Sequence, residues 1–187
     1  MESSETCVGF YTLSETQDGD GYLGAILITD DRGRPLEFRV TYPVRPSAFQ
    51  RPLYGDTLEP YIGVELCGGR LLTGLDHDVD VLIVSRPCLL DIRETVPCPV
   101  VYLERLGDAI EVHSDAPDQR AWAMGRVDSP SGRFQPVAVR VSSNWADDVE
   151  RSRPALEEAF EHLDLLEPFD RVSRALELLA KEDRRFA

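Results

Sequence analysis

The run Asp76-His77-Asp78-Val79-Asp80 holds the densest group of side chains that could bind a metal ion. In an extended segment alternate side chains point the same way, so Asp76, Asp78 and Asp80 share one side and His77 lies on the other. Aspartate and histidine are both metal ligands, which makes Asp76, His77 and Asp78 a candidate metal site. A solvated loop that leads into a buried strand is the simpler interpretation, because a transition-metal site needs histidine together with converging partners.

Arginine and aromatic side chains interleave in residues 32–51, the least acidic stretch of the chain. This stretch holds five arginines and one glutamate, a local charge of +4 in a chain whose net charge is −14. Both residue types are enriched at the centres of interfaces, although the arginines also have surplus acids elsewhere to pair with. The candidate residues for contact with a partner or an anion are Arg39, Tyr42, Arg45, Phe49, Arg51 and Tyr54.

The chain as a whole is acidic, with 34 aspartates and glutamates against 20 lysines and arginines in 187 residues. Duplex phosphate and anionic lipid repel such a chain at long range. Direct binding of nucleic acid is therefore not expected without a basic partner. The hydrophobic fraction of 42% is that of an ordinary globular protein and supports a packed core.

The N-terminal residues MESSETCVGF lack the basic and apolar regions of a secretory signal. No apolar run approaches the roughly 20 residues that span a membrane. The four cysteines form no C-x-x-C pair. These features predict a cytoplasmic protein with reduced thiols, no membrane association and no cofactor.

Three strands are predicted at 7–14, 22–29 and 36–42. β-forming residues fill the first two, and the third alternates apolar and polar residues as a half-buried strand does. The segments QDGDG and DDRGRP between them are turn signals. The first part of the chain is therefore predicted to be a three-stranded antiparallel meander.

A helix is predicted from about Leu53 to Leu75, with three residues that interrupt its pattern. Pro60 suits a first turn. Gly68 and Gly69 indicate either a close contact between the helix and the sheet or a break between two short helices.

The nearly continuous apolar run at 79–85 predicts a strand buried on both faces. A short helix at 87–96 and a strand at 99–104 would complete a β–α–β unit. Shorter strands are predicted at 108–113, 120–127 and 134–142, with a hairpin turn at 129–132.

Two amphipathic helices are predicted at 152–166 and 168–185, from apolar residues spaced three and four apart. The expected fold class is α/β with a mixed sheet. An α/β domain would occupy 1–144, and the helical segment 145–187 would pack on it or on a partner. The candidate contact face of the last helix comprises Phe169, Val172, Leu176 and Leu179.

Three antiparallel strands, a helix, a strand, a short helix and another strand resemble the ribonuclease-H-like fold in their order. The resemblance covers roughly residues 7–104. The segment GYLGAILITDDRGRPLEFRV is similar to the second and third strands of that fold, and VDVLIVSRPCLLDI is similar to its fourth strand and next helix.

Active members of that family cluster carboxylates that hold two divalent metals beside the scissile phosphate. The resemblance implies one acid in the middle of the first strand, one on the first helix and one at the end of the fourth strand. Here the first strand has Gly-Phe-Tyr-Thr at 9–12, and the fourth ends in Ser85-Arg86. Only the predicted helix has an acid of the kind that the resemblance implies, at Glu59 or Glu65. Since an arginine brings positive charge to a cation site, the nuclease site is expected to be absent.

These observations favour a non-catalytic interaction or scaffold subunit of a bacterial-type multi-component complex, such as one that processes nucleic acid or acts in defence. One alternative is a small-ligand sensor with a crevice near Ser85-Arg86, at the C-terminal ends of the parallel strands. The other is a divergent metal-dependent nuclease or phosphoesterase. Glu65 and Asp80 are its candidate catalytic carboxylates, and the full set to assemble would be Glu15, Asp18, Asp20, Glu65 and Asp80.

Overall fold

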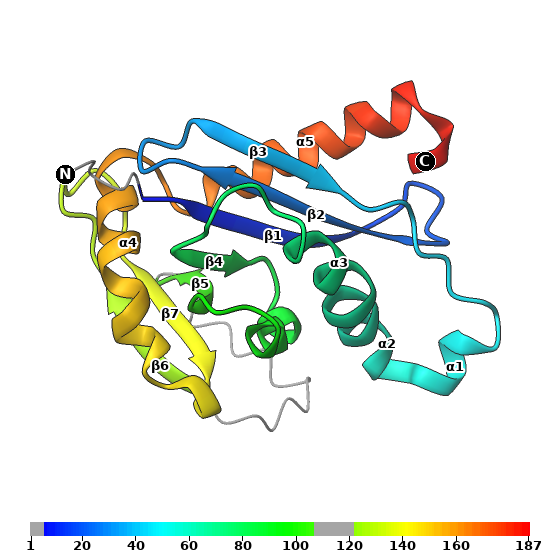
Figure 1. Ribbon diagram of the computed structural model, residues 1–187, viewed down its shortest axis with the longest axis horizontal. Helices are drawn as coiled ribbons and strands as arrows, with labels where there is room; N and C mark the ends of the chain where they lie inside the picture. The colour runs from blue at the N-terminus through cyan, green and yellow to red at the C-terminus, as the bar shows by residue number, and fades with distance from the viewer. Residues whose placement is uncertain (1–5, 107–121) are drawn as a thin grey trace.

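The computed structural model describes residues 6–106 and 122–187, which form one mixed sheet with helices on both faces (Figure 1). The α/β fold class is confirmed. The sheet has seven strands in the order β3-β2-β1-β4-β5-β7-β6. Their bounds are β1 (Val8–Glu15), β2 (Tyr22–Thr29), β3 (Pro35–Val40), β4 (Val81–Val84), β5 (Val100–Arg105), β6 (Trp122–Val127) and β7 (Val137–Ser142).

The predicted N-terminal meander is present. β2 pairs antiparallel with β1 and with β3. On its other side β1 pairs parallel with β4, which pairs parallel with β5. The C-terminal ends of β1, β4 and β5 therefore meet at one edge of the sheet, where open α/β sheets bind their ligands.

Helices of two kinds cover the two faces of the sheet. Regular α-helices cover one face, and shorter irregular helices from the middle of the chain cover the other. The helical bounds are α1 (Gln50–Tyr54), η1 (Gly55–Thr57), α2 (Leu58–Pro60), η2 (Tyr61–Gly68), α3 (Gly69–Leu72), η3 (Pro87–Glu94), η4 (Ser143–Trp145), α4 (Asp148–His162), α5 (Glu167–Glu182) and η5 (Arg184–Phe186).

Successive side chains of β1 point to opposite faces of the sheet, so this strand contributes residues to both cores. Phe10 points to the face that α4 and α5 cover, where its ring meets Phe169 edge-on at 5.7 Å. Tyr11 points to the other face, where its hydroxyl donates to the carbonyl of Gly63 at 2.6 Å. Both side chains are fully buried, so β1 lies at the centre of the molecule.

The segment predicted as one helix from Leu53 to Leu75 is instead a chain of short pieces, and η2 within it is a π-helix. Gly68 does not break it, because η2 continues directly into α3. The absence of Cβ atoms explains the close packing here. A Cβ on Gly68 would lie 2.5 Å from Ile92 of η3, and one on Gly24 of β2 would lie 2.5 Å from the Cβ of Cys67. Gly68 therefore allows η2 to pack closely against η3, and Gly24 of β2 allows the sheet to pack closely against η2.

Substituting Gly24 with alanine is expected to destabilise the fold by about 1–3 kcal/mol, because the new methyl group would overlap the Cβ of Cys67, which cannot move without its backbone. Gly69→Ala is the matched control, since its added Cβ meets nothing nearer than 3.8 Å. That helical substitution should stabilise by roughly 0.5–1 kcal/mol. Urea unfolding of both variants measures the difference; equal midpoints would contradict the close packing.

The turn between β2 and β3 is organised by the buried carboxylate of Asp30. It accepts hydrogen bonds from the backbone N–H of Arg32 at 3.0 Å and of Arg34 at 2.8 Å, and it pairs with the Arg34 guanidinium. Burial raises the pKa of Asp30, but the hydrogen bonds and the charge of Arg34 outweigh burial and lower the pKa overall. The ionised form is therefore favoured in the folded state.

Because the pKa of Asp30 is lower in the folded state, its stabilisation is present above the unfolded pKa of about 3.9 and disappears as the pH falls through the folded value. Asp30→Asn keeps the acceptor oxygen and removes the charge. We expect a loss of about 1 kcal/mol at neutral pH, which shrinks below about pH 4. Urea midpoints across this range check the prediction, and a pH-independent difference would contradict it.

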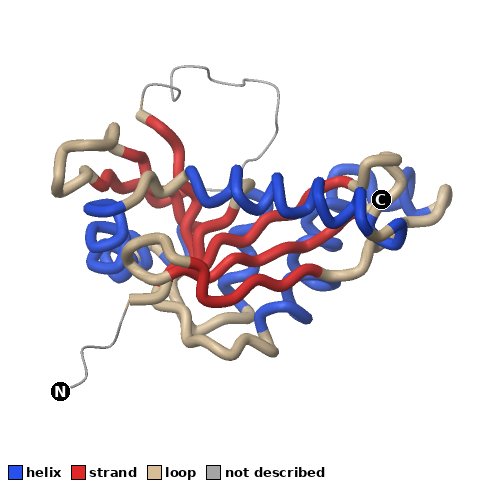
Figure 2. Tube along the Cα trace, turned by 90° about the horizontal axis from the view of Figure 1, so that it is seen from above, coloured by secondary structure: helices blue, strands red, loops and turns tan. Residues whose placement is uncertain are grey.

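The C-terminal half differs from the prediction in two details. α4 begins at Asp148 rather than at 152, and β7 lies between β5 and β6 because it pairs antiparallel with both. The strand predicted at 108–113 lies outside the described residues. α5 lies along one face of the sheet and ends near the C-terminus (Figure 2).

No disulfide forms among Cys7, Cys67, Cys88 and Cys98, and Cys67 is fully buried. Burial raises the pKa of the Cys98 thiol to about 11. In the described part of the chain, no helix has the length and apolar character needed to cross a bilayer.

Candidate functional site

Two hydroxyl groups meet at the C-terminal edge of the parallel strands. The register pairs Phe10 with Ile83 and Tyr11 with Val84, so the next residues, Thr12 and Ser85, lie level with each other. The backbone N–H of Ser85 donates to the carbonyl of Tyr11 at 3.0 Å. The hydroxyl of Ser85 donates to Thr12 Oγ1 at 2.8 Å.

The Thr12 hydroxyl is nearly buried, with the residue 9% exposed. It accepts the hydrogen bond from Ser85 and therefore keeps its own hydrogen to donate. Within the described residues, Thr12 donates that hydrogen to no other group. The pair thus offers a hydrogen-bond donor at a sheet edge that commonly binds ligands.

An ion pair is formed by the next residue of the chain, on the other side of the strand from the hydroxyl pair. Arg86 follows Ser85 and has an extended backbone, so its side chain leaves on the opposite side. Its Nη1 lies 2.6 Å from Glu59 Oε2, and both side chains remain more than one-third exposed. We call Thr12, Ser85, Arg86 and Glu59 the strand-end site. Glu59 also borders a cavity of about 320 Å³ lined by Tyr22, Gly55, Asp56, Leu58, Pro60 and Cys88.

The carboxylates predicted for a nuclease are not brought together. Asp80 precedes β4 and accepts from the backbone N–H of Cys7 at 2.8 Å, so it lies at the opposite end of the parallel strands from Ser85. Glu65 lies on η2 and borders a different groove, beside Asp91 and Glu94.

The other predicted carboxylates belong to the β1–β2 hairpin. Asp18 accepts from the hydroxyl of Thr16 and pairs with Arg45 at 2.7 Å. The hydrogen bond from Thr16 is the main cause that lowers the pKa of Asp18 to about 2. Glu15 ends β1 and is exposed. Asp18 therefore stabilises the β1–β2 turn. The acids of this hairpin do not lie beside Asp80.

A two-metal centre does not fit the described residues. Across 6–106 and 122–187, no three histidine, cysteine, aspartate or glutamate side chains are grouped so as to hold a metal ion. At the two strand positions where the ribonuclease-H-like resemblance implies carboxylates, the structure places the hydroxyls of Thr12 and Ser85. Alcohols without a partnering carboxylate supply no charge to a divalent cation.

The candidate metal residues Asp76, His77 and Asp78 lie in a loop at the other end of the sheet. Glu37 of β3 fixes this loop. Its carboxylate lies 3.0 Å from His77 Nδ1 and accepts from the backbone N–H of Asp76 at 3.0 Å. Arg39 pairs with both Glu37 and Asp76. Burial raises the pKa of Glu37, but these hydrogen bonds lower it overall. The contacts match the simpler interpretation of a structural loop.

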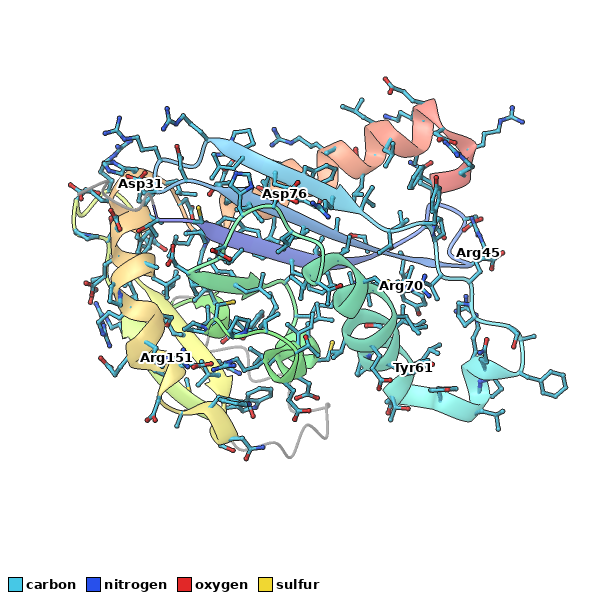
Figure 3. All side chains as sticks on the ribbon, viewed as in Figure 1. Asp31, Arg45, Tyr61, Arg70, Asp76 and Arg151 are labelled. Carbon is cyan, nitrogen blue, oxygen red and sulfur yellow. The ribbon has the colours of Figure 1, made fainter. Side chains whose placement is uncertain are left out.

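We call residues 32–51, together with the adjoining Leu53 and Tyr54, the Arg/aromatic segment. Its arginines have partners within the chain. Arg45 pairs with Asp18 and donates to the carbonyl of Ala187 at 2.8 Å, beside the β1–β2 turn (Figure 3). Arg51 donates to the carbonyl of Asp20 at 2.8 Å. The ion pair of Arg45 with Asp18 agrees with the alternative that the arginines pair with surplus acids, whereas Arg51 is bound to a backbone carbonyl.

The aromatic residues of the same segment divide into two groups. Tyr42 stacks on Phe186 at 5.3 Å, and Tyr54 stacks on Tyr61 at 4.9 Å. In contrast, Phe49 is 81% exposed and Leu53, one helical turn later, is 79% exposed. Tyr42 is also 63% exposed, so the exposed aromatic and apolar surface of this segment lies at Tyr42 as well as around α1.

The apolar face of α5 is occupied by this chain. Val172 and Leu176 are buried in the core between α5 and the sheet, and Phe169 packs against Phe10. Leu179 is partly buried. Three residues of the candidate contact face, Phe169, Val172 and Leu176, thus pack on the domain's own core, whereas Leu179 lies at its margin.

The arrangement of the strands and helices recurs in solved structures of low sequence identity. The structure is similar to that of endonuclease V from Bacillus subtilis, with a TM-score of 0.57, 11% identity, and coverage of 96% of this chain and 84% of that one. It is also similar to human endonuclease V, with a TM-score of 0.53, 12% identity, and coverage of 96% and 87%. No protein-family model and no curated protein matches the sequence.

These comparisons correct the main functional expectation. A non-catalytic interaction or scaffold subunit of a multi-component complex was expected, largely because catalytic sets are missing from the sequence. That expectation is wrong, because the two solved structures reported above are those of a nuclease. The missing catalytic motif was weak evidence against a nuclease, because proteins that share a fold can differ in their functional residues.

Proposed function

We propose that this chain is a divergent nuclease or phosphoesterase that acts on nucleic acid at the strand-end site. The observation that carries the proposal is the likeness to two endonuclease V structures over 96% of the chain. At 11–12% identity this likeness concerns the fold. The residues of the site supply the chemical part of the argument.

The strand-end site has groups that suit a phosphodiester. Hydroxyl and guanidinium groups are common donors to phosphate oxygens. Arg86 would offset the charge that develops on the phosphate in the transition state. Glu59 lies 2.6 Å from Arg86 and would accept a proton from an attacking water.

The net charge of −14 argued against direct binding of nucleic acid. We propose instead that the chain binds nucleic acid directly, with the Arg/aromatic segment as the contact surface. Exposed aromatic side chains stack on bases regardless of sequence, and Phe49 is 81% exposed. Arg45 and Arg51 flank it in the chain and would contact the backbone after exchanging their internal partners for phosphate.

The test is a cleavage assay on single- and double-stranded DNA and RNA, each with magnesium, with manganese and with a chelator. We expect at least one substrate to be cleaved, with loss of cleavage in Glu59→Gln. Glu65→Gln is the matched control and should retain the wild-type rate, because Glu65 borders a different groove. Absence of cleavage for every substrate under every condition would reject the proposal.

A further inference from the structure

We infer that the outer edge of β3 pairs antiparallel with the same strand of a second copy of this chain, so that two sheets join into one. In the described strand order β3 stands at the end, next to β2, and Figure 1 shows it at a margin of the sheet. An exposed strand edge offers its outward N–H and C=O groups to another strand. This pairing is independent of the proposed function and concerns a different surface.

The backbone groups that point outward from β3 follow from its ladder with β2. The backbone N–H of Thr41 donates to the carbonyl of Gly24 at 2.9 Å, so this pair occupies a hydrogen-bonded position. Hydrogen-bonded positions alternate along an antiparallel pair of strands. Glu37 and Arg39 therefore turn their backbone groups toward β2, whereas Phe38 between them turns its N–H and C=O outward. Phe38 thus offers one donor and one acceptor to another strand.

The charge pattern of β3 selects the register of such a pair. If two copies pair about Phe38, Glu37 of each lies opposite Arg39 of the other. The same register places Leu36 opposite Val40. Opposite charges on facing residues stabilise paired strands, and like charges destabilise them. A centre one residue earlier or later would place glutamate opposite glutamate or arginine opposite arginine. The segment Leu-Glu-Phe-Arg-Val is therefore complementary to its own reverse.

The same register brings exposed apolar side chains together on the face that α5 covers. Phe38 faces Leu27 of that core across the ladder and is 41% exposed. The Phe38 residues of two copies would lie opposite each other, about 5.5 Å apart at Cα. Leu178 of α5, 59% exposed, extends this surface. Arg171 lies about two turns earlier on the same face of α5 and donates to the carbonyl of Gly33. Because Gly33 lies just before β3, this face of α5 is the one beside β3.

Sedimentation velocity of the full chain across the micromolar range tests the inference. We expect the mass of the wild type to rise with concentration toward twice that of one chain. Phe38→Lys should raise the dissociation constant of the dimer by about tenfold or more, because it places two like charges opposite each other. Phe49→Lys is the matched control, since it makes the same change at an exposed aromatic residue outside β3 and should leave the mass unchanged. Circular dichroism checks that each variant is folded.

Charge reversal tests the register of the pair. Glu37→Arg and Arg39→Glu should each shift the chain toward the monomer when measured alone, because each places like charges opposite one another. An equimolar mixture of the two variants should form a heterodimer, because every facing pair of charges is then opposite in sign. Damage to the fold of either variant would not produce this recovery.

Cross-linking through a cysteine tests the same contact without charge. Phe38→Cys should give a covalent dimer under mild oxidation, because a Cα separation of about 5.5 Å suits a disulfide. Phe49→Cys is the control and should give no more covalent dimer than the wild type. A wild type that stays monomeric throughout the micromolar range would overturn the inference. A dimer that persists in Phe38→Lys and is not captured by Phe38→Cys would overturn it as well, since its interface would lie elsewhere.

Discussion

Replacing Asp148 with alanine is expected to destabilise the protein by about 3–5 kcal/mol, because it leaves a buried arginine without its counter-charge. The side chain of Asp148 is 1% exposed and that of Arg93 is 7% exposed. Arg93 Nε donates to Asp148 Oδ2 at 2.5 Å, and Arg151 donates to Oδ1 at 2.9 Å. A buried guanidinium that loses this partner cannot recover its hydration.

The position of this pair makes it important for assembly of the layers. Arg93 lies in η3 and Asp148 begins α4, so the pair joins helices from opposite faces of the sheet beside the start of β5. The Arg93 guanidinium also lies 3.9 Å from the centre of the Trp145 ring. Loss of Asp148 should therefore loosen both the start of α4 and η3.

Urea unfolding followed by circular dichroism at neutral pH measures the effect. The matched control is Glu150→Ala, which removes an exposed acid that pairs with Arg153 on the same helix. That change should cost less than about 1 kcal/mol. The double variant Arg93→Met/Asp148→Leu should recover most of the loss, because no buried charge remains unpaired. Equal midpoints for Asp148→Ala and Glu150→Ala would show that the buried pair contributes little.

Replacing Arg86 with alanine is expected to lower the rate of substrate cleavage by about 100- to 1000-fold, the usual effect of removing one group that stabilises transition-state charge. The reason is its place beside Ser85 at the end of β4, where it is the cation of the strand-end site. Arg86→Lys should retain part of the rate, since lysine keeps the charge and loses the planar set of donors.

The measurement is the single-turnover rate on the substrate that the wild type cleaves best. Arg153→Ala is the control, because Arg153 pairs with Glu150 and Glu157 on α4 and should leave the rate unchanged. The ion pair of Arg86 with Glu59 is partly exposed and contributes at most about 1 kcal/mol to folding. A folded Arg86→Ala variant with the wild-type rate would remove Arg86 from the site.

Local sequence signals determined much of the fold. The turn signals QDGDG and DDRGRP predict the strands that became β1, β2 and β3, because turn residues and alternating polarity act over short distances. Spacings of three and four likewise predict α5. The helix from Leu53 to Leu75 was less regular than predicted, since its path depends on glycines that fit η2 against η3 and the sheet.

Tertiary structure decided the rest. Thr12 and Ser85 are 73 residues apart, and only the parallel register of β1 and β4 brings their hydroxyls to 2.8 Å. The sequence showed that both positions lack an acid, but it did not show that they meet. The place of β7 between β5 and β6, and the pairing of Arg93 with Asp148, also depend on long-range contacts. Residue patterns report which face of a strand is buried, whereas the identity of the neighbouring strand depends on how the whole chain packs.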